Sequence, residues 1–317
     1  MSATANIAEN DAVAAASLTA SALKVLLYYD LFRYPLTVSE ILYHCRQTGC
    51  NEQELTDRLQ SLCEQECVFY CDGFYLLKDD QQLILRRKRG NQMAAQMMNK
   101  AAGRASLIAR FPYVRSVCVS GSLSKNYFDE STDIDFFIIT APNRLWVCRS
   151  LLILYKKIFL LNSKKYFCVN YFIDTENLEI PDKNIFTATE MITLIPFYNF
   201  NLYEEFIAVN SWVKDFYPNA SLRNQMLADK KDGFLKTIFE KLLNTALGEW
   251  LDRYFYKATV NHWKKKFPGF NEEEFEVNMR SRKDVSKHHP QGFQFRVLKL
   301  YRENCEAFEA KHGISLL

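Results

Sequence analysis

The chain has 317 residues, of which 48% are hydrophobic and 24% are charged. This is the composition of a globular protein, and it excludes a disordered, collagen-like or low-complexity chain. At roughly 150 residues per domain, the length predicts two or three domains. The 40 Lys and Arg residues nearly balance the 37 Asp and Glu residues, so the overall charge does not indicate a nucleic-acid-binding protein.

Cysteine usage and the apolar runs predict a cytoplasmic protein without a membrane contact. The nine cysteines are odd in number and most lie in apolar runs, which is typical of thiols in a reducing compartment. Cys63, Cys67 and Cys71 recur every four residues, but this spacing fits no established zinc motif. The N-terminus has no signal-peptide pattern, and the longest apolar run, residues 151–161, is too short and too charged to cross a bilayer.

The first region of the chain predicts a small helical module. Residues 1–19 are rich in Ala, Ser and Thr, and we expect a flexible tail there. Over residues 20–80 we expect three helices, of which the second and third start at the capping residues Thr37 and Asn51. An Asp-Gly pair at residues 72–73, between two β-prone runs, then predicts a hairpin. Three helices followed by a hairpin resemble a winged helix-turn-helix module.

The charge of this module disfavours DNA binding through its third helix. A winged-helix module commonly places that helix in the major groove. Residues 51–66 carry five acidic residues and one basic residue, Arg58, and a helix with this charge repels the phosphate backbone. DNA binding and a role in packing or partner docking are the two alternatives, and the charge favours the second.

A basic segment follows the module. Residues 81–128 contain nine Lys and Arg residues and no acidic residue. We expect a connecting helix over residues 81–112, and a solvated helix face is one interpretation of its charge. The other interpretation is a rim that attracts a polyphosphate or a nucleic acid, because the segment leads directly into the next motif.

The central motif joins two apolar strands through a Gly-Ser turn and an Asp-x-Asp pair. Gly121 and Ser122 follow the first strand, and the second strand opens with Asp133 and Asp135. Glycine lets the backbone approach a ligand closely, and the N–H groups that follow it suit a phosphate, with help from the Ser122 hydroxyl. Asp133 and Asp135 alternate on a strand, so both carboxylates face the same side. Beside a phosphate they form a natural Mg²⁺ site.

This combination resembles the nucleotidyltransferase superfamily that includes DNA polymerase beta, over about residues 113–175. The resemblance implies a small mixed-sheet nucleotidyltransferase core, which we place at residues 113–200. It also implies that two Mg²⁺ ions bind to Asp133 and Asp135 and align a nucleoside triphosphate with its acceptor for in-line displacement. The candidate nucleotide-binding residues of the turn and its short helix are Gly121, Ser122, Ser124 and Lys125.

The third carboxylate that the superfamily usually carries is replaced in this chain. We expect it on the strand over residues 166–173, where the inward polar residue is Asn170. An amide cannot act as a general base, and it is a weaker Mg²⁺ ligand than a carboxylate. Two alternatives follow: either Asp174 at the strand end reaches the metal and is catalytic, or the site lacks the residue that deprotonates the acceptor hydroxyl.

Residues 201–317 predict a helical C-terminal domain. Helices are expected over residues 201–216, 233–265 and 291–311. Between the last two helices, residues 280–290 contain six Arg, Lys and His residues and one acidic residue. A solvated loop is one interpretation of this segment. The other is binding of the nucleotide's phosphates or of the acceptor by residues such as Lys287 and His288.

The whole sequence therefore predicts an α+β protein with a winged-helix module, a small mixed-sheet nucleotidyltransferase core and a helical C-terminal region. The expected function is Mg²⁺-dependent transfer of a nucleoside monophosphate from a nucleoside triphosphate to an unidentified acceptor, which is a small molecule, an RNA or a protein. One rival is a catalytically weak or inactive nucleotide-binding regulator. The second is a nucleic-acid-binding regulator that acts through the winged helix.

Overall fold

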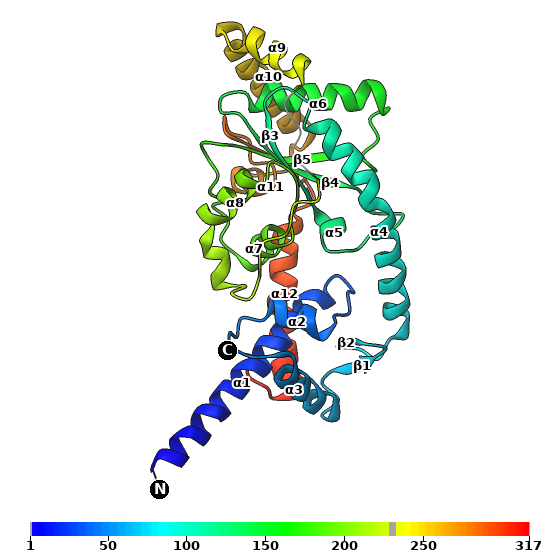
Figure 1. Ribbon diagram of the computed structural model, residues 1–317, viewed down its shortest axis with the longest axis vertical. Helices are drawn as coiled ribbons and strands as arrows, with labels where there is room; N and C mark the ends of the chain where they lie inside the picture. The colour runs from blue at the N-terminus through cyan, green and yellow to red at the C-terminus, as the bar shows by residue number, and fades with distance from the viewer. Residues whose placement is uncertain (1, 228–232, 317) are drawn as a thin grey trace.

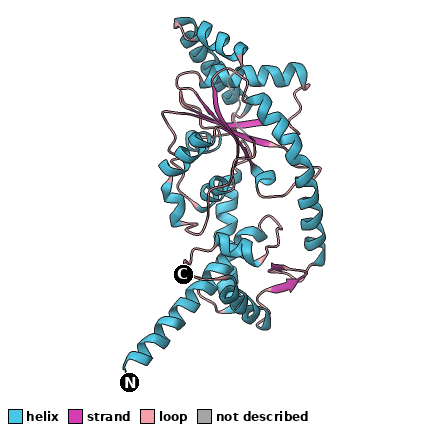
Figure 2. Ribbon diagram, viewed as in Figure 1, coloured by secondary structure: helices cyan, strands magenta, loops and turns pink. Residues whose placement is uncertain are grey.

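The computed structural model describes the backbone of residues 2–227 and 233–316 and the side chains of residues 16–227 and 233–316. The described chain is an α+β protein with a five-stranded mixed sheet, helices on both of its faces, and a separate two-stranded sheet (Figure 2). Figure 1 shows the N-terminal helices at one end and the five-stranded sheet toward the other. The long helix α4 (Gln81–Ile108) runs between them, where a connecting helix was expected over residues 81–112.

The N-terminal region contains the three helices and the hairpin that the sequence predicts. Thr37 and Asn51 cap the second and third helices through capping boxes. Both residues at the hairpin tip, Asp72 and Gly73, have positive φ angles of 53° and 86°, as the favoured two-residue hairpin turn requires. The elements are α1 (Ser2–Asp30), α2 (Val38–His44), α3 (Glu52–Glu64), β1 (Phe69–Cys71) and β2 (Phe74–Leu76).

Residues 2–19, where a flexible tail was expected, form the first part of helix α1 in the structure. The segment is rich in alanine, which has the highest helix propensity of all residues. The composition that suggested a tail therefore also favours a helix. Residue 1 lies outside the described residues.

The five-stranded sheet has the strand order β6-β3-β4-β5-β7. β3 pairs antiparallel with β4 and β6, β4 pairs parallel with β5, and β5 pairs antiparallel with β7. The parallel pair is joined by a crossover through helix α6 (Leu145–Phe159), as parallel neighbours require. The strands are β3 (Val114–Ser120), β4 (Asp135–Thr140), β5 (Cys168–Asp174), β6 (Ile195–Tyr198) and β7 (Val285–Lys287).

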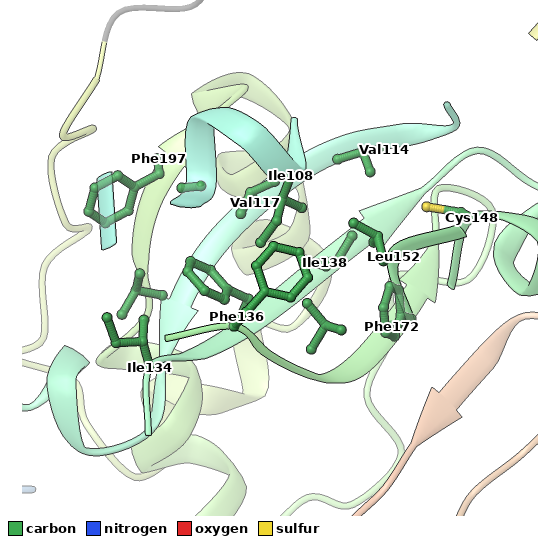
Figure 3. Close-up of a cluster of buried hydrophobic side chains, with 14 of the residues drawn as sticks. Ile108, Val114, Val117, Ile134, Phe136, Ile138, Cys148, Leu152, Phe172 and Phe197 are labelled. Carbon is green, nitrogen blue, oxygen red and sulfur yellow. The ribbon is translucent and has the colours of Figure 1, made fainter. Parts of the chain in front are cut away.

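Each face of the sheet packs against its own set of helices. On one face, side chains such as Phe136 and Ile138 join a buried cluster with residues of α4 and α6 (Figure 3). On the other face, side chains such as Phe137 pack against α7 (Ile185–Ile192) and α8 (Phe200–Val209). Beyond its first residue, β4 is apolar or buried over its whole length, because both of its faces are covered.

The C-terminal region does not form the separate helical domain that we expected. Its strand β7 extends the sheet along β5. Helix α12 (Phe293–His312) packs on α1, where Val297 and Phe308 join the N-terminal core. A three-residue strand inside a basic segment carries too little periodicity to be predicted. The last third of the chain therefore contributes to both ends of the molecule.

The single helix expected over residues 233–265 is two helices, α9 (Phe234–Leu243) and α10 (Ala246–Lys266). The turn between them brings the chain so close to itself that a Cβ at Gly248 would lie 1.7 Å from the carbonyl oxygen of Leu243. The apolar pattern runs on across this turn, because α9 and α10 both carry aromatic and aliphatic residues, and it therefore gave no sign of the break.

Two shorter elements, a 3₁₀ turn and a short helix, complete this region. The helix expected over residues 201–216 ends at Val209 and is followed by a 3₁₀ turn (Ser211–Asp215). Helix α11 (Glu272–Asn278) precedes β7, and the helix expected over residues 291–311 is confirmed as α12. In the part of the chain that the structure describes, no helix has the length and apolar character that a membrane span requires.

Candidate functional site

The Gly-Ser turn and the Asp-x-Asp segment meet at one end of the β3–β4 pair. β3 ends at Ser120, which pairs with Asp135 at the start of β4, and the one-turn helix α5 (Gly121–Ser124) follows Ser120. Gly121 has a φ of +68°, and a Cβ at this position would lie 2.5 Å from Oδ2 of Asp135. Glycine alone accommodates both this backbone conformation and this close approach, so the turn and the carboxylate form one site.

Asp135 is the central group of this site. Nδ2 of Asn170 donates a hydrogen bond of 3.0 Å to its Oδ1. Burial is the main reason why the pKa of Asp135 is raised from 3.8 to about 7; the Cys168 thiol opposes this rise, and the negative charges of Asp133 and Glu190 add to it. A carboxylate in this setting favours a proton or a cation beside it.

Asn170 lies where the third carboxylate was expected. The register between β4 and β5 shifts between Phe136 and Phe137, and Asn170 is the extra residue of β5 at this bulge. Its Oδ1 accepts a hydrogen bond of 3.1 Å from the Cys168 thiol, and its amide nitrogen contacts Asp135. The contact confirms that Asn170 points toward the Asp-x-Asp segment, so the neighbouring strand presents an amide to it.

Asp174 is not part of this site, which corrects the first of the two alternatives for the third carboxylate. It pairs with Thr140 at the far end of β4, whereas Asp135 pairs with Cys168 at the near end. Five residues along a strand separate these pairs, which is about 17 Å. Oδ1 of Asp174 instead accepts hydrogen bonds from the Glu176 N–H and from the Asn177 amide group.

Two of the predicted nucleotide-binding residues hold the turn together. Oγ of the buried Ser124 donates to the Gly121 carbonyl oxygen at 2.9 Å, and Nζ of Lys125 donates to the same oxygen at 3.1 Å. Lys125 also forms an ion pair with Glu190, Nζ to Oε1 2.8 Å. Ser124 is therefore a structural residue, because a helix of one turn points its last hydroxyl back at its first carbonyl. Ser122 is half-buried at the start of the helix.

A cavity of about 110 Å³ extends from Gly121 and Asp135 along the sheet face that α7 and α8 cover. Lys287 lines it, and burial lowers the pKa of this lysine. Its Nζ donates a 2.9 Å hydrogen bond to Oε1 of Gln294 and lies 3.3 Å from Oδ2 of Asp182. The remaining walls are mostly apolar and include Phe137, Tyr171, Phe186, Met191, Leu194 and Phe206.

His288 does not join this cavity, although the sequence analysis included it. Its backbone N–H donates to the Asn170 carbonyl oxygen at 3.0 Å, and its ring packs 4.8 Å from the Trp263 ring. Burial lowers the pKa of His288 to about 3. Side chains alternate along an extended chain, so Lys287 and the neighbouring His289 line the cavity instead.

Two further side chains belong to this site and were not expected from the sequence, Glu190 and Cys168. Glu190 lines the cavity from α7, of which it is the single charged residue. An isolated carboxylate in an apolar helix is a signal that could have been noticed. Cys168 pairs with Asp135 across the strands, and burial raises the pKa of its thiol. Nothing in the local pattern distinguishes it from a core cysteine.

Three of the six basic residues of α4 bind the N-terminal module. Nη1 of the buried Arg87 donates to the Pro35 carbonyl oxygen at 2.6 Å, and its Nη2 forms an ion pair with Glu40 at 2.6 Å. Arg86 donates to two carbonyl oxygens of the loop after α1, and Lys88 pairs with Asp72. These three side chains therefore correspond neither to the solvated helix face nor to the polyphosphate-binding rim that were the two interpretations of this segment.

The residues at Asp135 fit a Mg²⁺ ion that keeps most of its water. Asp135 opens β4, whereas Asp133 precedes the strand and is not among the residues that line the cavity. Carboxylate oxygens such as theirs are the ligands that this cation prefers. The described ranges contain no group of three His, Cys, Asp or Glu side chains placed to hold a metal. Two carboxylates would hold a Mg²⁺ ion only together with several water ligands.

Comparisons of the chain with protein-family models, with curated proteins and with solved structures found no match. The function is therefore inferred from the geometry of the site and from the motif that builds it.

Proposed function

We propose that this chain is a Mg²⁺-dependent nucleotidyltransferase, which transfers a nucleoside monophosphate from a nucleoside triphosphate to an acceptor. The observation that carries the proposal is the close approach of Gly121 to Asp135, with Oδ2 only 2.5 Å from a Cβ at the glycine. A backbone turn without a side chain next to a carboxylate of raised pKa suits a metal-bound polyphosphate. Asp133 adds the second carboxylate.

The strand order supports this proposal. The strands that carry the Gly-Ser turn, the Asp-x-Asp pair and Asn170 are neighbours in the sheet, in the order β3-β4-β5. The resemblance to the polymerase-beta-like superfamily requires this neighbourhood, because the turn and all three polar positions have to meet at one end of the sheet. The antiparallel β3–β4 pair and the parallel β4–β5 pair bring them together here.

Each polar group has a role in the proposed reaction. Asp133 and Asp135 hold the Mg²⁺, which when bound neutralises the phosphate charge and polarises the bond to the leaving pyrophosphate. The N–H groups of Gly121 and Ser122 bind the phosphates. Asn170 orients Asp135 through the 3.0 Å hydrogen bond and cannot take a proton. Glu190 lines the cavity and its charge acts on Asp135; its carboxylate, paired with Lys125 in the described conformation, is the group to which we assign acceptance of the proton from the acceptor hydroxyl.

The cavity is too small for a nucleotide in the described conformation. Small-molecule sites usually enclose about 300–1,000 Å³, and this one encloses about 110 Å³. Its walls include Phe186 and Met191 of α7 and Gln294 of α12. Entry of a nucleoside triphosphate therefore requires α7 or the start of α12 to move away from the sheet.

A nucleotide-binding regulator without turnover is the second candidate function. The observation that favours it is the amide of Asn170 at the place where a carboxylate is expected, hydrogen-bonded to Asp135. In this case Mg²⁺ and a nucleoside triphosphate bind, and no pyrophosphate leaves. The ion pair of Glu190 with Lys125 would then be a permanent structural contact.

The test is incubation of the purified protein with nucleoside triphosphates labelled at the α-phosphate, with Mg²⁺ and a cell extract as the source of acceptor. We expect a labelled product and pyrophosphate release in the wild type, and loss of both in Asp135→Asn. The matched control is Asp174→Asn, which changes a carboxylate of the same sheet about 17 Å away. Equal activity in Asp135→Asn and wild type would contradict the assigned site.

A second variant separates the two candidate functions. Glu190→Gln removes the proposed base and keeps the shape of the side chain, so we expect label transfer to fall at least tenfold while nucleotide binding is retained. If the wild type binds a nucleoside triphosphate with Mg²⁺ but transfers no label to any acceptor, the regulator is the correct function and the nucleotidyltransferase is not.

A further inference from the structure

A second cavity lies between the N-terminal helices and the Gly-Ser turn, and it shares no lining residue with the first. Its volume of about 480 Å³ is in the usual range for small-molecule sites. Helices α1 and α2, the segment after Gly121 and the loop at residues 221–223 contribute its walls. Buried Leu36 and Leu123 line it, whereas the exposed Ser39 also lines it at the surface.

Arg223 brings an unbalanced positive charge to this cavity. Among the described residues it forms no ion pair, and its buried Nε has no hydrogen-bond partner. The other charges along the walls are matched: Arg87 pairs with Glu40 at 2.6 Å, and Lys125 pairs with Glu190 at 2.8 Å. Buried donors are normally satisfied by an acceptor, and a guanidinium group is best satisfied by a carboxylate or a phosphate.

Tyr43 supplies an aromatic surface beside this charge. The guanidinium carbon of Arg223 lies 5.6 Å from the centroid of the Tyr43 ring. The Tyr43 hydroxyl donates to the Ser221 carbonyl oxygen at 3.1 Å, and the His44 ring packs edge-on against the Tyr43 ring with 5.0 Å between the centroids. A planar ligand would therefore contact this ring beside the Arg223 guanidinium. The adjacent His44 adds no charge near neutral pH, because burial lowers its pKa to about 4, and its Nε2 contacts the Tyr29 hydroxyl at 2.7 Å.

We propose that this cavity binds a small organic anion, with a carboxylate or phosphate group on Arg223 and a planar body against the Tyr43 ring. The binding needs no group of the Asp135 site and stands apart from the proposed nucleotidyl transfer. It is nevertheless linked to that site, because Lys125 lines this cavity and also holds the Gly121 carbonyl oxygen.

The experiment is titration calorimetry of the full chain without Mg²⁺, with AMP as the planar phosphate probe and benzoate as the planar carboxylate probe. We expect at least one of them to bind, and which one binds identifies the anionic group. Arg223→Gln should weaken that binding at least tenfold, because it removes the charge and keeps the length of the side chain. Arg46→Gln is the matched control, since this exposed arginine of the same region lies outside the cavity, and it should bind as the wild type does.

Two further variants complete the test. One blocks the cavity from an exposed position, and the other changes the Asp135 site without touching this cavity. Ser39→Trp fills the mouth of the cavity from an exposed helix position and should also weaken binding at least tenfold. Asp135→Asn should leave it unchanged, so a failure of the proposed nucleotidyl transfer does not affect this result. Binding of neither probe at millimolar concentration, binding of inorganic phosphate alone, or binding that survives both Arg223→Gln and Ser39→Trp would overturn the proposal.

Discussion

At the scale of single residues, the raised pKa of Asp135 predicts how the stability of the fold depends on pH. Its pKa in the folded protein is about 7, against an ordinary value of 3.8. Between these pH values the folded protein holds a proton that the unfolded chain has released. Protonated Asp135 therefore contributes fully to the free energy of unfolding below about pH 4. This contribution is lost as the pH rises to about 7, and the total loss is at most about 4 kcal/mol.

The measurement is denaturant unfolding from pH 4.5 to pH 8 without Mg²⁺, for the wild type and for Asp135→Asn. His44 and His289 have pKa values lowered to about 4 by burial, so they change stability in the opposite direction with pH. These histidines are present in both proteins, so they affect both equally. The difference between the two curves of unfolding free energy against pH therefore gives the contribution of Asp135 alone. Parallel curves would show that this carboxylate is ionised over the whole range.

The position of Gly121 gives a second prediction about single residues, the cost in stability of adding a side chain there. Gly121→Ala places a side chain at a φ of +68° and drives its Cβ against Asp135. Gly49 has a φ of +77° with no atom within 4 Å of a Cβ, so Gly49→Ala isolates the cost of the backbone conformation, about 1 kcal/mol. We expect Gly121→Ala to lower the free energy of unfolding by about 2–3 kcal/mol. Equal losses in the two variants would mean that the contact with Asp135 is relaxed at no cost.

At the scale of elements, β5 shows how a single side chain can set the properties of the site. Asn170→Asp replaces the amide that donates to Asp135 by a third acidic group. Without metal, the added charge next to Asp135 and Asp133 should destabilise the fold. With Mg²⁺ the same charge binds the ion, and we expect the melting temperature of this variant to rise more steeply with Mg²⁺ than that of the wild type.

The matched control is Asn177→Asp, which adds the same charge at the far end of β5, beside Asp174. Its melting temperature should depend on Mg²⁺ no more than that of the wild type. Thermal unfolding over a Mg²⁺ titration measures both. If Mg²⁺ raised the melting temperature of Asn170→Asp no more than that of the control, the metal would not bind beside Asn170.

The elements themselves show which signals in a sequence carry over into structure. The caps at Thr37 and Asn51 and the hairpin turn are confirmed, because each depends on residues within four positions of each other. The break between α9 and α10 and the short strand β7 were missed. Both are decided by contacts with distant parts of the chain, and local periodicity contains no record of such contacts.

At the scale of the whole molecule, the difference between local signals and long-range contacts explains how much of the site could be predicted from the sequence. Gly121, Asp135 and Asn170 were placed correctly relative to one another, because adjacent strands fix them. Asp174 was misplaced because the parity of a strand gives the face and not the position along it. Glu190 was missed because the path of α7 over the sheet is a long-range property.

In the proposed function, Asp133 and Asp135, beside the Gly121 turn, bind a nucleoside triphosphate through Mg²⁺. The most direct measurement is titration calorimetry of the wild type, Asp135→Asn and Asp174→Asn with ATP, GTP, CTP and UTP, each with and without Mg²⁺. We predict that at least one nucleotide binds in a Mg²⁺-dependent way, that Asp135→Asn lowers its affinity at least tenfold, and that Asp174→Asn leaves it unchanged. Binding should also weaken as the pH falls below about 7, because Asp135 takes up a proton there. Failure of all four nucleotides to bind with Mg²⁺, or equal binding by Asp135→Asn and the wild type, would contradict the account.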